Sequence, residues 1–122
     1  MGKKIILIVD DDLISQNMLR TTLTGAGYSV LTASSGGEGI ELAGKELPGL
    51  IILDIMMPGI DGTEAAEILR SNSRTKDIPI IFLSSLITKK EEKTADKKDI
   101  ASSISKPYNR EKLLNEVRKY FE

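Results

Sequence analysis

Short apolar runs alternate along the chain with longer segments of helical periodicity, and this alternation is the feature that most limits the fold. Residues 5–9 read Ile-Ile-Leu-Ile-Val, a β-branched run typical of a strand that is buried on both faces. Further strand-length segments lie at 28–32, 50–53, 79–83 and 102–105, of which 28–32 is weaker and 102–105 is short and poor. A strand followed by a helix, five times over, predicts an α/β fold in which helices cover both faces of a parallel sheet.

Each strand-length run is followed by a helix start signal, and in four of the five cases apolar residues at helical spacing follow that signal. Ser, Thr, Asp and Asn are the residue types that cap helix N-termini, and one of them stands at each expected start. The expected caps are Asp12, Ser35, Asp61, Thr88 and Asn109; the apolar stripes are Ile14, Met18, Leu19, Leu23 and Ala26, then Ile40, Ala43 and Leu47, then Ala65, Ile68 and Leu69, and finally Leu113, Val117 and Phe121.

The composition removes several kinds of chemistry, because the 122 residues include no cysteine and no histidine. Disulfides, thiol catalysis, a Ser-His-Asp triad and a His-ligated zinc site are all excluded. A metal ion would have to be held by oxygen atoms, and oxygen ligands favour Mg²⁺, Ca²⁺ or Mn²⁺.

Length and charge point to one ordinary globular domain. A chain of 122 residues has the size of a single domain, so we expect residues 1–122 to form one domain with no output domain attached. The net charge of −1 gives no support for binding to nucleic acid or to a bilayer. No apolar run approaches the roughly 20 residues that a membrane span needs, and no signal peptide is visible, so we expect a cytoplasmic protein.

Most of the residues that could do chemistry follow directly after the predicted strands. Asp10 and Asp11 follow the first strand, Asp54 follows the third, Ser84 follows the fourth and Lys106 follows the fifth. Parallel strands bring their carboxyl ends to one edge of the sheet, and this edge is where such sheets bind ligands. The sequence therefore predicts one site that contains all five side chains.

The chemistry of this predicted site follows from its charges. Three carboxylates held close together repel one another and are tolerable when a divalent cation such as Mg²⁺ neutralises them. A lysine supplies a point charge that suits phosphate, a hydroxyl supplies a hydrogen-bond donor, and a carboxylate can form an acyl phosphate. Together these groups are the parts of a site for phosphoryl transfer.

Four motifs along the whole chain resemble those of the receiver domains of two-component response regulators. They are Ile-Val-Asp-Asp-Asp at 8–12, Leu-Asp-Ile-Met-Met-Pro-Gly-Ile-Asp-Gly at 53–62, Leu-Ser-Ser at 83–85 and Lys-Pro-Tyr at 106–108. Their order and spacing fit that family. The resemblance implies a flavodoxin-like (βα)5 fold, doubly wound, with the five parallel strands in the order 2-1-3-4-5.

The resemblance also implies roles for the acidic residues. Asp54 would accept a phosphoryl group from a histidine kinase or a histidine phosphotransfer protein. Asp11 and Asp54 would bind Mg²⁺ directly, or Mn²⁺ in its place, together with the backbone carbonyl of Met56. Asp10 would act on the ion through a bound water.

On the other side of the implied site, Ser84 and Lys106 would contact the phosphoryl group, and the peptide bond before Pro107 would be cis. Many receivers carry an aromatic switch residue three positions before the motif lysine, but this chain has Ser103 there. The segment 89–98 also departs from the family, since Ala95 is almost its only apolar residue. We hypothesise that a change of order in this weakly held helix carries the switch instead.

Two other functional classes are weaker interpretations of the same residues. A haloacid-dehalogenase-type phosphohydrolase shares the Asp nucleophile, Mg²⁺, hydroxyl and lysine, but it needs a general acid two residues after the nucleophile, where this chain has Met56. A pseudo-receiver that never takes phosphate usually lacks part of the site, and no part is missing here. The favoured interpretation is a signalling domain, not an enzyme in the ordinary sense.

Partner surfaces and phosphoryl lifetime follow from this interpretation. We expect the phosphodonor to dock on the first helix through Ser15, Met18 and Leu19, and an unknown output protein to meet the face formed by the fourth helix, the fifth strand and the last helix. The protein would be a monomer or a weak dimer. Met56 and Leu86 are apolar at two positions that help set the phosphoryl lifetime in receivers, so we expect slow autodephosphorylation.

Overall fold

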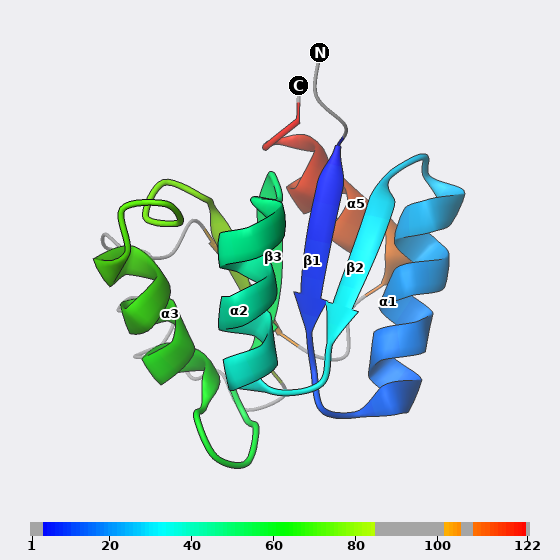
Figure 1. The fold of residues 1–122 in the computed structure, drawn as a ribbon. Helices are drawn as coiled ribbons and strands as arrows, with labels where there is room; N and C mark the ends of the chain where they lie inside the picture. Colours follow the sequence, from blue (N-terminus) through cyan, green and yellow to red (C-terminus); the bar gives the residue numbers. More distant parts are fainter. Residues whose placement is uncertain (1–3, 85–101, 106–108, 122) are drawn as a thin grey trace.

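Five parallel strands form the middle layer of the fold (Figure 1). The computed structural model describes residues 4–84, 102–105 and 109–121, and leaves the side chains of Ser84, Ser102, Ser103 and Ser105 undescribed. The strands lie in the order β2-β1-β3-β4-β5, which confirms the predicted doubly wound parallel sheet. Their bounds are β1 (Ile5–Val9), β2 (Ser29–Ala33), β3 (Leu50–Asp54), β4 (Ile80–Ser84) and β5 (Ser102–Ser105).

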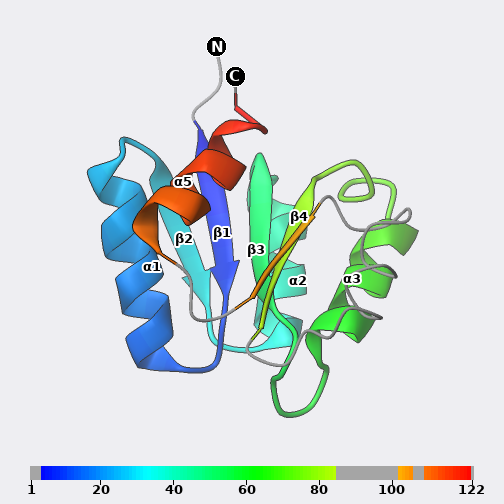
Figure 2. The ribbon, with the colours of Figure 1, turned by 180° about the vertical axis from the view of Figure 1, so that it is seen from behind.

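Among the described residues, four helices cover the two faces of this sheet. They are α1 (Leu13–Gly25), α2 (Gly36–Glu46), α3 (Gly62–Ser71) and α5 (Arg110–Arg118). Helices α2 and α3 cover one face, and the opposite view in Figure 2 shows α1 and α5 on the other. The helix expected at 89–98 lies outside the described residues. Within the described ranges, no helix combines the length and the apolar character needed to cross a membrane.

The hydrophobic core is split into two clusters by the sheet, because successive residues of a strand point to opposite faces. Strand β1 shows this alternation, with Leu7 and Val9 on the side of α2 and α3 and with Ile6 and Ile8 on the side of α1 and α5. Strand β3 is buried over its whole length, as expected for a central parallel strand.

The predicted strand boundaries are correct to within one residue, and the backbone N–H groups explain where β2 and β4 begin. Strand β2 begins at Ser29 because the Tyr28 N–H donates to the carbonyl of Leu23 and so closes the end of α1. Strand β4 begins after Pro79, whose ring nitrogen carries no hydrogen to donate.

Several residues of the predicted apolar stripes are exposed, and the expectation that Leu47 points inward was wrong. Leu47 is 47% exposed because α2 ends at Glu46 and Leu47 turns into the left-handed region, with φ of 50°, as the C-cap. Ile68 is exposed because Ala65, Ala66 and Leu69 form the buried face of α3. In α1, Leu19 and Leu23 are buried, whereas Ile14, Met18 and Ala26 are exposed.

Four of the predicted caps are confirmed, while Thr88 lies outside the described residues. The side chains of Asp12, Ser35 and Asn109 each accept a hydrogen bond from a backbone N–H in the first turn that follows. Asp61 forms a complete capping box, because it accepts from the Glu64 N–H and the Glu64 carboxylate accepts from the Asp61 N–H.

Replacing Asp61 by Ala should lower the free energy of unfolding by about 1 kcal/mol, because the Glu64 N–H loses its acceptor. The bonds from the Glu64 N–H and the Thr63 hydroxyl hold the pKa of the Asp61 carboxyl below its usual value. Because the pKa of Asp61 is lower in the folded state than in the unfolded state, its ionised carboxylate stabilises the fold at a pH above the unfolded-state pKa. This contribution is lost as the pH falls through the folded-state pKa.

Urea unfolding of wild type and Asp61→Ala, at neutral pH and at progressively lower pH, measures this effect. The difference in free energy of unfolding between the two proteins should become smaller as the pH falls below the usual pKa of aspartate. Asp61→Asn is the control, since Asn also caps a helix and should keep most of the stability at neutral pH. Equal stability of wild type and Asp61→Ala at neutral pH would contradict the prediction.

Candidate functional site

Three carboxylates meet at the carboxyl edge of the sheet, at the end of the two central strands. Asp54 is the last residue of β3, while Asp10 and Asp11 follow β1, which pairs with β3 up to Val9 and Leu53. One carboxylate oxygen from each of the three residues lies within 4.8 Å of the others. Asp10 is 1% exposed and Asp54 is 7% exposed, whereas Asp11 is exposed to solvent. The fold therefore brings together the three acids that the sequence predicted as one cluster.

Two of these carboxylates also shape the loops on which they stand. Asp10 Oδ1 accepts a hydrogen bond from the Asp12 N–H at 2.9 Å. Asp54 Oδ1 accepts from the Met56 N–H at 3.3 Å. Bonds from a side chain to the backbone two residues later are typical of Asx turns, so each strand turns at its carboxylate.

The loop from β3 to α3 is closed at its base by a glycine. The Gly62 N–H donates to the carbonyl of Ile55 at 2.9 Å. A Cβ atom at Gly62 would lie 2.4 Å from the carbonyl oxygen of Asp54, so only glycine fits this close approach of two backbones. Met57 is buried in the core and Met56 is 56% exposed. The loop therefore holds the backbone of Met56 close to Asp54.

The electrostatics of the cluster favour a bound cation. Three like charges at this separation repel one another, and the fold buries two of them, which weakens the screening by water. Carboxylate oxygens are the ligands preferred by hard divalent cations such as Mg²⁺ and Mn²⁺. The residues present thus fit such an ion, with Asp10, Asp11 and Asp54 as its acidic surroundings.

Of the other predicted site residues, the structure describes the backbone of Ser84 and of Ser103 only. The backbone of Ser84 ends β4, the strand next to β3, and pairs with Ser105 of β5. Ser103 pairs with Phe82 in the same sheet. The roles expected for the side chains of Ser84 and Ser103, and the predicted roles of Lys106 and Pro107, lie outside what the structure describes.

Gln16 of α1 is a residue at this edge that the sequence reasoning missed. It is 7% exposed, and its Nε2 donates to the carbonyl oxygens of Asp10 and Ala33 at 3.1 and 3.2 Å. The sequence did indicate that Gln16 is buried, because it lies on the same helical stripe as Leu19 and Leu23. A polar residue on an otherwise apolar buried stripe needs hydrogen-bond partners.

A doubly wound parallel sheet with an acidic, oxygen-lined site at its carboxyl edge defines a class of α/β proteins that hold a cation and a ligand at this edge. The comparisons with known proteins identify the family within this class. Residues 6–118 match the family model described as "Response regulator receiver domain". The chain belongs to that family, whose members are signalling domains of two-component systems and coordinate Mg²⁺ at an acidic site.

Individual relatives agree with this assignment. Protein PilH of Pseudomonas aeruginosa is 32% identical over 92% of this chain and 93% of its own length. The chemotaxis protein CheY4 of Vibrio cholerae has a solved structure with a TM-score of 0.90 and 30% identity, covering 98% of this chain and 99% of that one.

A second solved structure is the receiver domain of the sensor histidine kinase PA1611 of Pseudomonas aeruginosa, described with a magnesium ion coordinated in the active site cleft. It superposes with a TM-score of 0.88 at 22% identity and covers 98% of both chains, so it shows the fold. The chain spans between a third and a half of the length of the probable transcriptional regulators that it also matches.

Replacing Gly62 by Ala should disturb both stability and the site. The new Cβ would collide with the backbone of Asp54 and Ile55, and overpacking against backbone costs about 2 kcal/mol. The free energy of unfolding, measured in urea, should fall by about this amount, and the affinity for Mg²⁺ should weaken because the Asp54 backbone must move.

Gly37→Ala is the matched control, since Gly37 also lies in the first turn of a helix but has nothing within 4 Å of the position that a Cβ atom would take. Alanine is the better helix former, so this variant should gain about 0.5 kcal/mol and bind Mg²⁺ as the wild type does. Equal stability of the two variants would show that the close approach at Gly62 does not constrain the loop.

Proposed function

We propose that this receiver domain accepts a phosphoryl group on Asp54 from the histidine of a kinase or a histidine phosphotransfer protein, in the cytoplasm. The observation that supports this most directly is the cluster of Asp10, Asp11 and Asp54, whose oxygens lie within 4.8 Å at the carboxyl edge of a receiver fold. The family and the order of the four sequence motifs support the same assignment.

The geometry suits Asp54 as the group that forms the new bond. One of its oxygens attacks phosphorus, and the bond from phosphorus to the donor nitrogen breaks, which leaves an acyl phosphate on the protein and a neutral imidazole on the donor after protonation. Asp11, Asp54 and the carbonyl of Met56 would ligate the cation, and Asp10 would reach it through water. A Mg²⁺ ion held there would supply positive charge to the phosphoryl oxygens.

The acyl phosphate on Asp54 should be long-lived. Met56 is two residues after Asp54, 56% exposed, and apolar. A thioether cannot orient or deprotonate an attacking water, and general-base assistance commonly contributes a factor of about 10² or more to hydrolysis. We therefore expect autodephosphorylation in minutes or longer rather than seconds.

Incubation with acetyl phosphate and Mg²⁺, followed by intact-protein mass spectrometry, tests the proposed chemistry. Wild type should gain the mass of one phosphoryl group, and the label should depend on Mg²⁺. Asp54→Asn should gain none, because an amide cannot form the acyl phosphate. Asp77→Asn is the control, since it removes an acid outside the cluster and should label normally.

The rate at which the label disappears after acetyl phosphate is removed measures the lifetime in the same experiment. Equal labelling of wild type and Asp54→Asn would disprove Asp54 as the acceptor. A half-life of seconds with Mg²⁺ present would leave the acceptor intact but contradict the proposed slow hydrolysis.

An exposed apolar surface at the start of α1 supports a docking place for the phosphodonor. Leu13, Ile14 and Met18 are 61%, 72% and 61% exposed, and α1 begins two residues after Asp11. Leu19, which the sequence analysis had placed on this surface, is buried in the core, so that expectation was wrong. Exposed apolar side chains beside an acidic site suit a helical partner that presents its histidine to Asp54.

Ile14→Asp should slow phosphorylation by a cognate histidine donor by about tenfold or more, since a charge on this surface would be desolvated by the partner. Labelling by acetyl phosphate should be unchanged, because this small donor needs no docking surface. Ile68→Asp is the matched control, as Ile68 is 43% exposed on α3. Equal rates for the two variants with the protein donor would rule out docking at Ile14.

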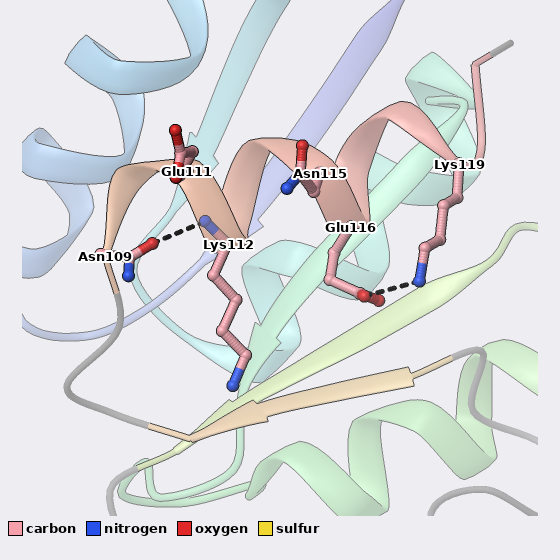
Figure 3. A pocket seen from close by; sticks show the side chains of 6 residues that line it. All are labelled: Asn109, Glu111, Lys112, Asn115, Glu116 and Lys119. Atoms are coloured by element: carbon pink, nitrogen blue, oxygen red, sulfur yellow. Dashed lines mark hydrogen bonds and ion pairs between the residues drawn. The ribbon is translucent and has the colours of Figure 1, made fainter.

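For the output partner we propose the surface that includes α5. Asn109, Glu111, Lys112, Asn115, Glu116 and Lys119 line a shallow depression of about 480 Å³ on this helix (Figure 3). Two acidic and two basic side chains line the depression, and Arg110 and Arg118 on the same helix bring residues 110–119 to four basic and two acidic side chains. The hydrogen bond and charge of Glu116, 2.8 Å away, raise the pKa of Lys119. A partner with acidic groups would complement this surface.

A further inference from the structure

The side-chain amide of Gln16 is buried next to the carboxyl ends of β1 and β2. The last pair in register between β1 and β2 joins Val9 to Ala33. Just beyond it, the Asp10 N–H donates to the Ala33 carbonyl at 3.0 Å. From α1, the Gln16 Nε2 donates to that same carbonyl and to the carbonyl of Asp10, with Ser34 Oγ a more distant third acceptor at 3.4 Å.

This arrangement uses both hydrogens of the amide. An amide nitrogen has two hydrogens, and its two shortest contacts are the carbonyls of Asp10 and Ala33. The Ala33 carbonyl accepts from the Asp10 N–H as well, so its two lone pairs are both used. One side chain thus joins α1, β1 and β2 where the ladder of backbone bonds ends.

Gln16 holds the backbone at the start of the turn that carries two of the three acids of the cluster. Asp10 is itself in the cluster, and Asp11 is the next residue. The Asp10 side chain also binds the Asp12 N–H, so the whole turn from β1 to α1 is fixed at its beginning by the Gln16 amide and at its middle by Asp10. Movement of the Asp10 carbonyl would therefore move both carboxylates relative to Asp54.

We propose that Gln16 is a positioning residue for the divalent-cation site, which fixes the backbone of Asp10 and Asp11 so that their carboxylates face Asp54. The inference rests on the proposed function, since it assigns a role toward the cation of that same site. Gln16 acts through the two acids and contacts neither the cation nor the phosphoryl group.

Gln16→Met tests this role, because methionine keeps the length and bulk of the side chain but has no hydrogen to donate. Mg²⁺ is titrated into the full chain and followed by amide chemical shifts in NMR spectra. Residues that orient metal ligands commonly change the affinity by about tenfold or more, and we expect a Kd raised by about this factor. Urea unfolding is measured on the same samples.

Thr75→Val is the matched control for a buried hydrogen bond lost elsewhere. Thr75 is 2% exposed, and its hydroxyl donates to the carbonyl of Leu69 at 2.7 Å, at the opposite end of α3 from the acidic cluster. This variant should lose stability but bind Mg²⁺ like the wild type. A purely structural role for Gln16 would give the same result in Gln16→Met.

Acetyl phosphate labelling at limiting and at saturating Mg²⁺ separates positioning from chemistry. Gln16→Met should label slowly at limiting Mg²⁺ and approach the wild-type rate at saturation. A rate that stays low at saturating Mg²⁺ would overturn the proposal, because the defect would then lie beyond cation binding.

Wild-type Mg²⁺ binding with an unchanged Kd in Gln16→Met would overturn this inference and leave the proposed function standing. A wild type that neither binds Mg²⁺ nor labels would overturn both. If Gln16→Met does not fold, Gln16→Asn replaces it, since its amide is one methylene too short to reach both carbonyls; the same rise in Kd is expected, and an unchanged Kd would again overturn the proposal.

Discussion

Mutual repulsion between three carboxylates is the constraint on which the rest of this structure depends. Their oxygens lie within 4.8 Å of one another, and two of the three groups are buried, so the surroundings must hold them against a force that separates them. The two strands behind them supply this resistance. All of β3 and four of the five residues of β1 are buried, and full burial of each large apolar side chain contributes about 1.5–3 kcal/mol.

The loops beyond these strands convert a rigid sheet into a defined site. The carboxylates of Asp10 and Asp54 each accept a hydrogen bond from the backbone N–H two residues later, which fixes the turn of the loop that follows. Gly62 allows the start of α3 to lie against the backbone of Asp54. Gly36 plays a similar part, since a Cβ atom there would lie 2.8 Å from the carbonyl oxygen of Ile60. The lack of a side chain at Gly36 and Gly62 is therefore as important here as the functional groups, because it allows close contact between backbones, and this contact leaves the loop little room to move.

The sequence predicts the fold and the acidic cluster because both depend on regular patterns. Buried parallel strands read as continuous apolar runs, and acids placed after such runs must gather at one edge. Leu47 could not be predicted in the same way, since its exposure depends on where α2 stops and not on helical period. Helical spacing places Gln16 on the buried stripe of α1, but its two carbonyl partners, Asp10 after β1 and Ala33 in β2, cannot be identified from the sequence.

Residues close together on helix α1 contact three different surroundings, which are the core, the turn that carries the acidic cluster, and the solvent. Leu19 is buried in the core, Gln16 holds the carbonyl of Asp10, and Ile14 lies exposed on the outer side. A partner that binds Ile14 and shifts the helix would shift Gln16 with it. Thermodynamic linkage then requires reciprocity: whatever factor the partner applies to Mg²⁺ affinity, Mg²⁺ applies to the affinity for the partner. The concentration of free Mg²⁺ would in this way help set the affinity for the proposed phosphodonor.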